Sequence, residues 1–164
     1  MRQLILIRHA KSSWDNVELN DFDRPLNKRG KRDVPFMANL LAQKNIIPEL
    51  IISSPALRTK LTAIEFAKKL NINENEIIWD KNLYLAPASK ILNIIHKIDF
   101  KIKCVLLVGH NPGLTDLQNL LCKDEIDNIP TCGIVSMATN EEWSKINVKD
   151  FNLQFFEYPK KYFK

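Results

Sequence analysis

Two arginines and two histidines are the residues of this sequence best suited to chemistry on a phosphoryl group. Arg8 and His9 directly follow one short apolar run, His110 follows another, and Arg58 comes shortly after a third. Guanidinium groups bind phosphoryl oxygens through paired hydrogen bonds, and a neutral imidazole is a nucleophile near pH 7. Each residue alone also fits a surface or capping role. Together they predict a phosphate-handling site.

The elements that must position these residues alternate along the chain. Apolar runs at 4–7, 50–52, 77–79 and 104–108 predict strands, and helical spacing marks 28–44, 56–70, 88–97 and a segment around 114–121. Two more strand-like segments, 133–139 and 151–158, flank a turn at 140–142. The pattern predicts one α/β domain over 1–164, a three-layer α/β/α sandwich. Its sheet is mostly parallel, with an antiparallel strand near one edge.

Functional sites in open α/β sheets lie beyond the carboxyl ends of the strands, and the four residues all follow strands. Two predicted helices also begin there. Ser54 is placed to cap one helix with Pro55 as its first residue, and Asn111 is placed to cap the other before Pro112. We therefore expect two positive helix ends to face the same crevice as the arginines.

Composition and charge narrow the possible partners. The net charge is +5, from 24 Lys+Arg and 19 Asp+Glu, with no basic block or nucleic-acid motif, so we expect no nucleic-acid partner. No apolar run approaches a membrane span, and the first residues lack a signal-peptide pattern, so we expect a cytoplasmic protein with no membrane partner. Three cysteines without a CxxC pair favour free thiols over a zinc site, and we expect no metal or cofactor.

Three segments resemble the motifs of the histidine phosphatase superfamily, in the same order and spacing. They are LILIRHAKSSW around His9, ISSPALRTKLTA around Arg58 and VGHNPGLTDL around His110. Further segments resemble its SixA-type phosphohistidine phosphatase branch, namely DFDRPLNKRGKRD (21–33), LYLA (83–86) and IPTCGIVSM (129–137). Ala10 replaces the glycine that usually follows the first histidine, a change this branch tolerates.

The resemblance implies that His9 is the nucleophile that becomes phosphorylated. It also implies that Arg8, Arg58 and His110 surround the phosphoryl group, and Ser12 is a further candidate for substrate binding. The substrate implied is a phosphorylated protein of the histidine phosphotransfer type, or a small phosphorylated molecule.

The acidic residue that many phosphomonoesterases of the superfamily carry after the third strand has no counterpart in the segment DKNLY (80–84). Asp15 and Asp80 remain candidates for a general acid, whereas Asp21, Asp23 and Arg24 suggest only a loop ion pair. Since a phosphoramidate leaves more easily than an alkoxide, we expect a metal-independent phosphatase that hydrolyses phosphohistidine. The alternatives are a small-molecule phosphomonoesterase and a non-catalytic phosphate- or phosphoprotein-binding module.

Overall fold

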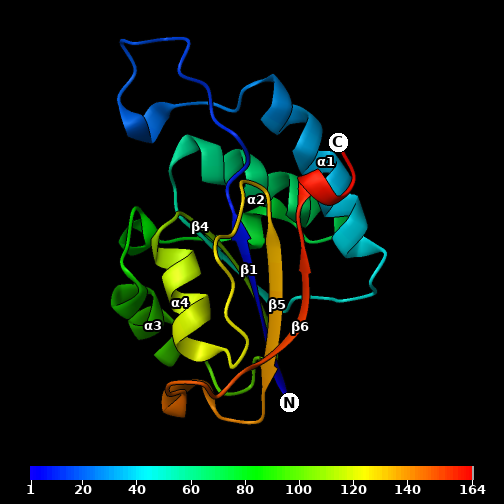
Figure 1. The fold of residues 1–164 in the computed structure, drawn as a ribbon, viewed down its shortest axis with the longest axis vertical. Coiled ribbons are helices and arrows are strands. Elements are labelled where there is room, and N and C mark those ends of the chain that lie inside the picture. The colour runs from blue at the N-terminus through cyan, green and yellow to red at the C-terminus, as the bar shows by residue number, and fades with distance from the viewer. Residues whose placement is uncertain (164) are drawn as a thin grey trace.

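The computed structural model describes residues 1–163, and a six-stranded sheet runs through its centre (Figure 1). The strands lie in the order β3-β2-β4-β1-β5-β6. Their bounds are β1 Arg2–Arg8, β2 Leu50–Ser53, β3 Ile78–Trp79, β4 Cys104–Gly109, β5 Ile134–Thr139 and β6 Asn152–Glu157. β1 therefore lies inside the sheet, with β4 on one side and β5 on the other.

The strand directions confirm the predicted mixed sheet. β1 pairs in parallel with β4, and β2 pairs in parallel with both β4 and β3. β5 runs antiparallel to β1, and β6 runs antiparallel to β5. β5 is thus the single strand of reversed direction, one place in from the β6 edge. Because β1, β2 and β4 are parallel, their carboxyl ends meet at one edge of the sheet.

Four α-helices complete the α/β/α layers that the pattern predicted. They are α1 Lys28–Ala42, α2 Leu57–Lys69, α3 Ala88–His96 and α4 Gly113–Leu121. β1 shows why both faces need cover, since Leu4 and Leu6 belong to the core with α3 and α4, whereas Ile5 and Ile7 belong to the core with α1 and α2. All four side chains are 0% exposed. This burial on both faces is typical of a strand inside a mainly parallel sheet.

Two predicted helix starts lie slightly too early, by two residues for α2 and by one residue for α4. α2 begins at Leu57 after Ala56, and α4 begins at Gly113 after Pro112, so neither proline is the first helical residue. The hydroxyl of Ser54 accepts a hydrogen bond from the backbone N–H of Ala56 at 3.3 Å, just before α2, and another from the ring of His110 at 2.8 Å. Asn111 does act near the start of α4, where its Oδ1 accepts from the backbone N–H and the hydroxyl of Thr115.

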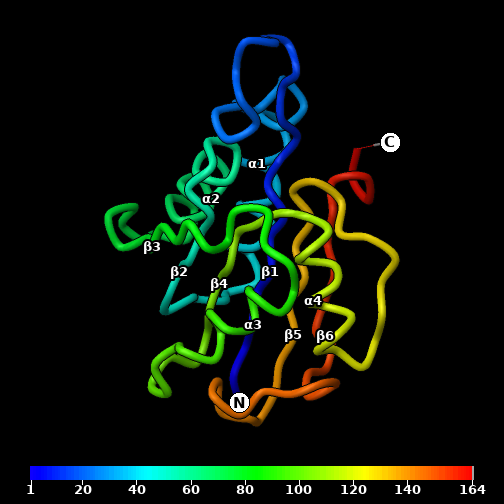
Figure 2. Tube along the Cα trace, turned by 90° about the vertical axis from the view of Figure 1, so that its left-hand side faces the viewer, coloured from blue at the N-terminus to red at the C-terminus, as the bar shows by residue number. Residues whose placement is uncertain are grey.

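The segment between β1 and α1 projects beyond the carboxyl end of the sheet in both views (Figures 1 and 2). The N-terminus lies at the opposite end of the molecule, whereas the C-terminal segment returns to α1 (Figure 1). Asn27 caps α1 by accepting a hydrogen bond from the backbone N–H of Gly30 at 2.9 Å. In residues 1–163, no helix combines the length and the apolar character needed to cross a membrane.

Candidate active site

Arg8 and His9 stand at the carboxyl end of β1, as the sequence predicted, and the backbone around them is fixed from two sides. The N–H of His9 donates to the carbonyl of Gly109 at the end of β4, at 3.1 Å. On the other side, the N–H of Cys132 donates to the carbonyls of both Arg8 and His9, at 3.0 and 3.1 Å. The central strand therefore presents both side chains from a rigid backbone.

The ring of His9 is held in one neutral tautomer. Its Nδ1 lies 2.7 Å from the carbonyl oxygen of Ala10, and because a carbonyl can only accept, Nδ1 carries the hydrogen. The side chain is buried, and desolvation together with nearby arginines lowers the pKa of His9 to about 3. At neutral pH the ring is therefore uncharged, and the lone pair of its Nε2 is available as a nucleophile.

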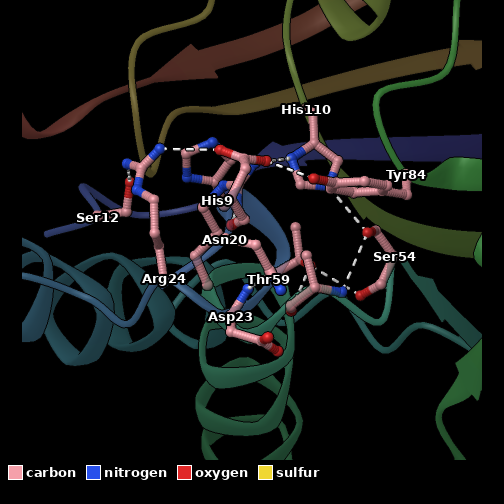
Figure 3. Close-up of polar contacts among 12 residues, drawn as sticks. His9, Ser12, Asn20, Asp23, Arg24, Ser54, Thr59, Tyr84 and His110 are labelled. Atoms are coloured by element: carbon pink, nitrogen blue, oxygen red, sulfur yellow. Dashed lines mark hydrogen bonds and ion pairs between the residues drawn. The ribbon is translucent and has the colours of Figure 1, made fainter. Parts of the chain in front are cut away.

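His110 packs beside His9, with the two ring centroids 5.3 Å apart (Figure 3). Its Nδ1 lies 3.3 Å from Nη2 of Arg58, which can only donate, so the hydrogen of the neutral ring is on Nε2 and is donated to Ser54 Oγ at 2.8 Å. Burial, followed by the neighbouring His9 and Arg58, lowers the pKa of His110 to about 3. The second histidine is thus also neutral, and it orients the guanidinium of Arg58.

Arg58 reaches the same place from the first turn of α2 and is only 3% exposed. Its guanidinium donates to the carbonyl oxygen of Asp21 at 2.7 Å and to the carboxylate of Asp21 at 2.9 Å. A buried guanidinium needs such partners, because an unpaired charge away from water is costly. The structure therefore brings the predicted Arg58 and His110 together and adds Asp21 to them.

Arg8 is the arginine with donors to spare. Its Nη1 donates to the carbonyl of Ile129 at 3.0 Å, whereas its buried Nε has no hydrogen-bond partner among the described residues. Burial and the nearby charge of Arg58 lower the pKa of Arg8 below its usual value. A buried donor without a partner is rare in proteins, and an anion bound beside His9 would satisfy it.

Asp21 and Arg24 form the predicted loop ion pair, and the structure also joins Asp21 to Arg58 and Tyr84, which the sequence interpretation missed. The carboxylate of Asp21 accepts from the Tyr84 hydroxyl at 2.5 Å and from Arg24 at 2.9 Å, in addition to Arg58. Partial burial alone would raise the pKa of Asp21, but the hydrogen bonds from Tyr84 and Arg58 outweigh it and hold that pKa below the usual value. The available signal was their place in the two segments, 21–33 and 83–86, that resemble the SixA-type branch.

The remaining predicted residues lie further from the histidines. Ser12 is buried, and its hydroxyl accepts a hydrogen bond from Arg24 (Figure 3). Asp15 is exposed on the projecting segment, and the carboxylate of Asp80 accepts from the N–H of Asn82. Within residues 1–163, neither carboxylate is hydrogen-bonded to the arginines or histidines of the site. Ser12 is therefore linked to Asp21 only through Arg24, and the two candidate acids lie apart from this hydrogen-bonded group.

Comparisons with known proteins identify the family of this chain. Residues 4–83 match the family model of the histidine phosphatase superfamily (branch 1). An uncharacterized chloroplastic protein of Arabidopsis thaliana is 32% identical over 153 residues, which is 88% of this chain and 70% of that protein. The chain belongs to the histidine phosphatase superfamily and is a phosphatase of that superfamily.

Within the superfamily, the chain is of the SixA type. The structure of the candidate phosphohistidine phosphatase SixA of Agrobacterium tumefaciens superposes with a TM-score of 0.82 and 28% identity, covering 96% of this chain and 98% of that one. A protein histidine phosphatase SixA complexed with tungstate shares the fold, with a TM-score of 0.83, 22% identity and coverage of 97% and 98%. Phosphoserine phosphatase 1 of Hydrogenobacter thermophilus is 40% identical over 83 residues, 48% of this chain and 38% of that protein.

The two neutral histidines predict a loss of stability in acid. In the folded protein the pKa of each of these histidines is about 3, whereas the pKa of a histidine in an unfolded chain is about 6.5. Between these values the unfolded state binds protons that the folded state does not, so the free energy of unfolding falls as the pH drops from about 6.5 towards 3. Each ring contributes up to about 1.4 kcal/mol per pH unit.

Urea denaturation at several pH values measures this effect. The variant His110→Gln is expected to lose stability less steeply with falling pH than the wild-type protein. His96→Gln, at the end of α3 and outside the site, controls for the loss of a histidine elsewhere in the fold. A slope for His110→Gln equal to that of the wild-type protein would contradict the neutral state of His110.

Proposed function

We propose that this protein hydrolyses phosphohistidine in a protein substrate, through an intermediate in which His9 carries the phosphoryl group. The observation that carries the proposal is the free Nε2 lone pair of His9, next to the unpartnered Nε of Arg8 and the buried guanidinium of Arg58. Three arginines, including Arg24, against the one carboxylate of Asp21 leave a positive site around a neutral nucleophile. Such a site can bind a phosphoryl group and stabilise the charge on its oxygens during transfer.

In the first step, Nε2 of His9 attacks phosphorus, and the bond between phosphorus and the substrate nitrogen breaks. The phosphoryl oxygens are held by Arg8 and Arg58 while the group passes in line between the two nitrogens. The substrate imidazole leaves with the electron pair of the broken bond. If its other nitrogen is already protonated, it leaves as a neutral ring.

In the second step, water attacks the phosphoryl group on His9 and the nitrogen–phosphorus bond breaks. Both protons of the water leave with the released inorganic phosphate, and the electron pair of the broken bond becomes the lone pair of Nε2, which restores neutral His9 because Nδ1 has kept its hydrogen. The hydrogen bond from Nδ1 of His9 to Ala10 keeps the ring orientation unchanged through both steps. No step requires a metal ion, because the arginines supply the positive charge.

The state of Asp21 supports a phosphohistidine substrate over an alcohol phosphate. A carboxylate with a lowered pKa has no proton to give at neutral pH, so it cannot serve as the acid that an alkoxide requires. It can instead accept a hydrogen bond from a leaving group that already carries an N–H. Burial, reinforced by Asp21, raises the pKa of Tyr84, which makes its hydroxyl a weak proton donor as well.

The dependence of the rate on the leaving group tests this proposal. We expect good turnover of a phosphohistidine protein, slow turnover of p-nitrophenyl phosphate and poor turnover of alkyl phosphates. Across aryl phosphates, kcat/KM should fall steeply as the pKa of the leaving phenol rises, because no acid neutralises the leaving oxygen. Asp15→Asn and Asp80→Asn should keep this steep dependence, because neither carboxylate is hydrogen-bonded to the arginines or histidines of the site among residues 1–163.

A small-molecule phosphomonoesterase is the second candidate function. The observation in its favour is the 40% identity, over 83 residues, to phosphoserine phosphatase 1. A flat dependence on leaving-group pKa, together with good turnover of phosphoserine, would favour it over the phosphohistidine proposal. A protein that binds phosphate but turns over none of these substrates would instead be a binding module.

A further inference from the structure

A positively charged groove lies outside the residues of the proposed mechanism. It is formed by the first turns of α1, the loop before β5 and the C-terminal 3-10 helix Pro159–Lys161, and it encloses a cavity of about 250 Å³. Its charged lining residues are Arg29, Arg32, Lys160 and Asp33. The ring of Phe163 forms part of the wall, with the guanidinium of Arg32 stacked on it at 4.0 Å.

The groove is joined to the active site by the loop before β5. On one side of this loop, the carbonyl of Ile129 accepts from Arg8, and the N–H of Cys132 donates to the carbonyl of His9. On the other side, the hydroxyl of Thr131 accepts from Arg29 at 3.1 Å. A molecule bound over His9 therefore comes within reach of the groove by crossing a single loop.

α1 is also pressed against the segment that follows the nucleophile. A Cβ atom at Gly30 would overlap the carbonyl oxygen of Lys11, so the first turn of α1 packs directly on the backbone two residues after His9. Only glycine permits this approach. It fixes the basic end of the helix beside the carboxyl end of β1.

The charges at this end of α1 oppose the stability of the helix itself. Its first five residues are Lys-Arg-Gly-Lys-Arg, and its first turn holds no acidic residue. Cations at a helix N-terminus are unfavourable because the helix dipole is positive there. Asp33, 1% exposed, offsets part of the charge by pairing with Arg32 at 2.7 Å. The remaining positive charge favours the binding of an anionic partner.

Asp33 pairs with Arg29, at 3.9 Å, as well as with Arg32, yet the basic side chains of the groove stay open to solvent. The side chains of Arg29 and Arg32 are 47% and 48% exposed. Lys160 is exposed and makes no ion pair among residues 1–163. Arginine beside an aromatic ring is typical of protein interfaces.

We propose that this groove docks acidic side chains on the surface of the phosphohistidine protein, next to its phosphorylated histidine. The inference rests on the proposed function and adds the surface by which a protein substrate is selected over a small phosphate ester. Rim charges of this kind speed encounter and fix orientation, and salt weakens them. The groove does not touch the reacting group, so small substrates do not sense it.

A substrate pair tests the proposal. The protein substrate is an acidic histidine-phosphotransfer domain phosphorylated with phosphoramidate, and the small one is p-nitrophenyl phosphate. The double variant Arg29→Gln/Lys160→Glu should lower kcat/KM for the phosphorylated domain about tenfold at low salt. It should leave kcat/KM for p-nitrophenyl phosphate unchanged, and salt should narrow its difference from the wild type. Lys160→Glu alone, at an exposed position, should show a smaller loss of the same kind and guards against misfolding of the double variant.

Lys31→Glu is the matched control, because Lys31 lies in the same helical turn but lines a different groove with Leu26 and Leu61. An equal loss in this control, or an equal loss on both substrates, would overturn the docking surface. So would unchanged phosphodomain turnover in the double variant, or RNA binding that depends on these residues while phosphodomain turnover does not. A wild-type protein that hydrolyses p-nitrophenyl phosphate but not the phosphorylated domain would overturn the proposed function and this inference with it.

Discussion

Replacement of His9 by alanine is expected to abolish turnover, with a loss in kcat of at least about a thousandfold. Alanine removes the Nε2 lone pair that the hydrogen bond to Ala10 leaves free, and no other side chain of the site offers an equivalent nucleophile. His110 cannot take its place, because its Nδ1 faces Arg58 and its Nε2 donates to Ser54. We therefore expect His9 to act as the nucleophile and His110 to orient Arg58.

The phosphorylated intermediate provides the direct measurement. Wild-type protein quenched during turnover of a ³²P-phosphorylated substrate should carry label that is labile in acid, stable in alkali and located at His9. His96→Ala is the control, since its ring contacts the carbonyl of Ile146 away from the site. Label on another residue, or wild-type turnover by His9→Ala, would refute the mechanism.

Arg58→Ala is expected to lower kcat/KM by about a hundredfold or more, or roughly 3 kcal/mol of transition-state stabilisation. The side chain is the most deeply buried guanidinium of the site and is already oriented by Asp21 and His110. Losing it removes the positive charge that the proposed mechanism places against the phosphoryl oxygens. It also leaves the negative charge of Asp21 next to the position of the incoming phosphate.

The same substitution is expected to change the thermal stability much less than the rate. The buried face of α2 is built mainly by Ala63, Phe66 and Ala67, which Arg58→Ala leaves in place. Arg58→Lys is the matched variant, because it keeps the charge but loses the paired geometry, and it should recover only part of the rate. Thermal melts and kcat/KM measured on the same preparations separate the two effects. A large fall in Tm with normal kcat/KM in the folded fraction would assign Arg58 to structure.

The sheet could be predicted from the sequence because the residues of its inner strands are nearly all apolar, as expected for strands buried on both faces. The run Leu4–Ile7 is apolar at every position, which fits only a strand covered on both faces, and the structure has it so. The ends of β3 were harder to predict, because this edge strand has only two residues and Ile78 is 50% exposed. The local bond from Ala56 to Ser54 is of the kind that capping rules describe, whereas the bond from His110, fifty-six residues away in the sequence, could not be predicted from local sequence.

The site residues also fall into a group that could be predicted from regular structure and a group that could not. Arg8, His9, Arg58 and His110 follow directly from strand ends or the first turn of a helix, where regular geometry dictates where a residue lies. Asp21 and Tyr84 belong to short 3-10 turns or their ends, and no periodic pattern fixes the path of such segments. Only the folded chain brings the Tyr84 hydroxyl within 2.5 Å of Asp21, across sixty-three positions of sequence.

The reversed direction of β5 has a consequence for how the substrate range of this protein can be changed. Because β5 runs against β1, the chain that precedes it borders His9, whereas the turn that follows it lies at the far end of the sheet. Lengthening the part of this loop at residues 130–131, between Ile129 and Cys132, which bond to Arg8 and His9, would thus add chain beside the site proposed for the phosphoryl group. Length changes at Asn140 would leave access untouched. Redesign towards smaller substrates should begin with insertions in the first of these two segments.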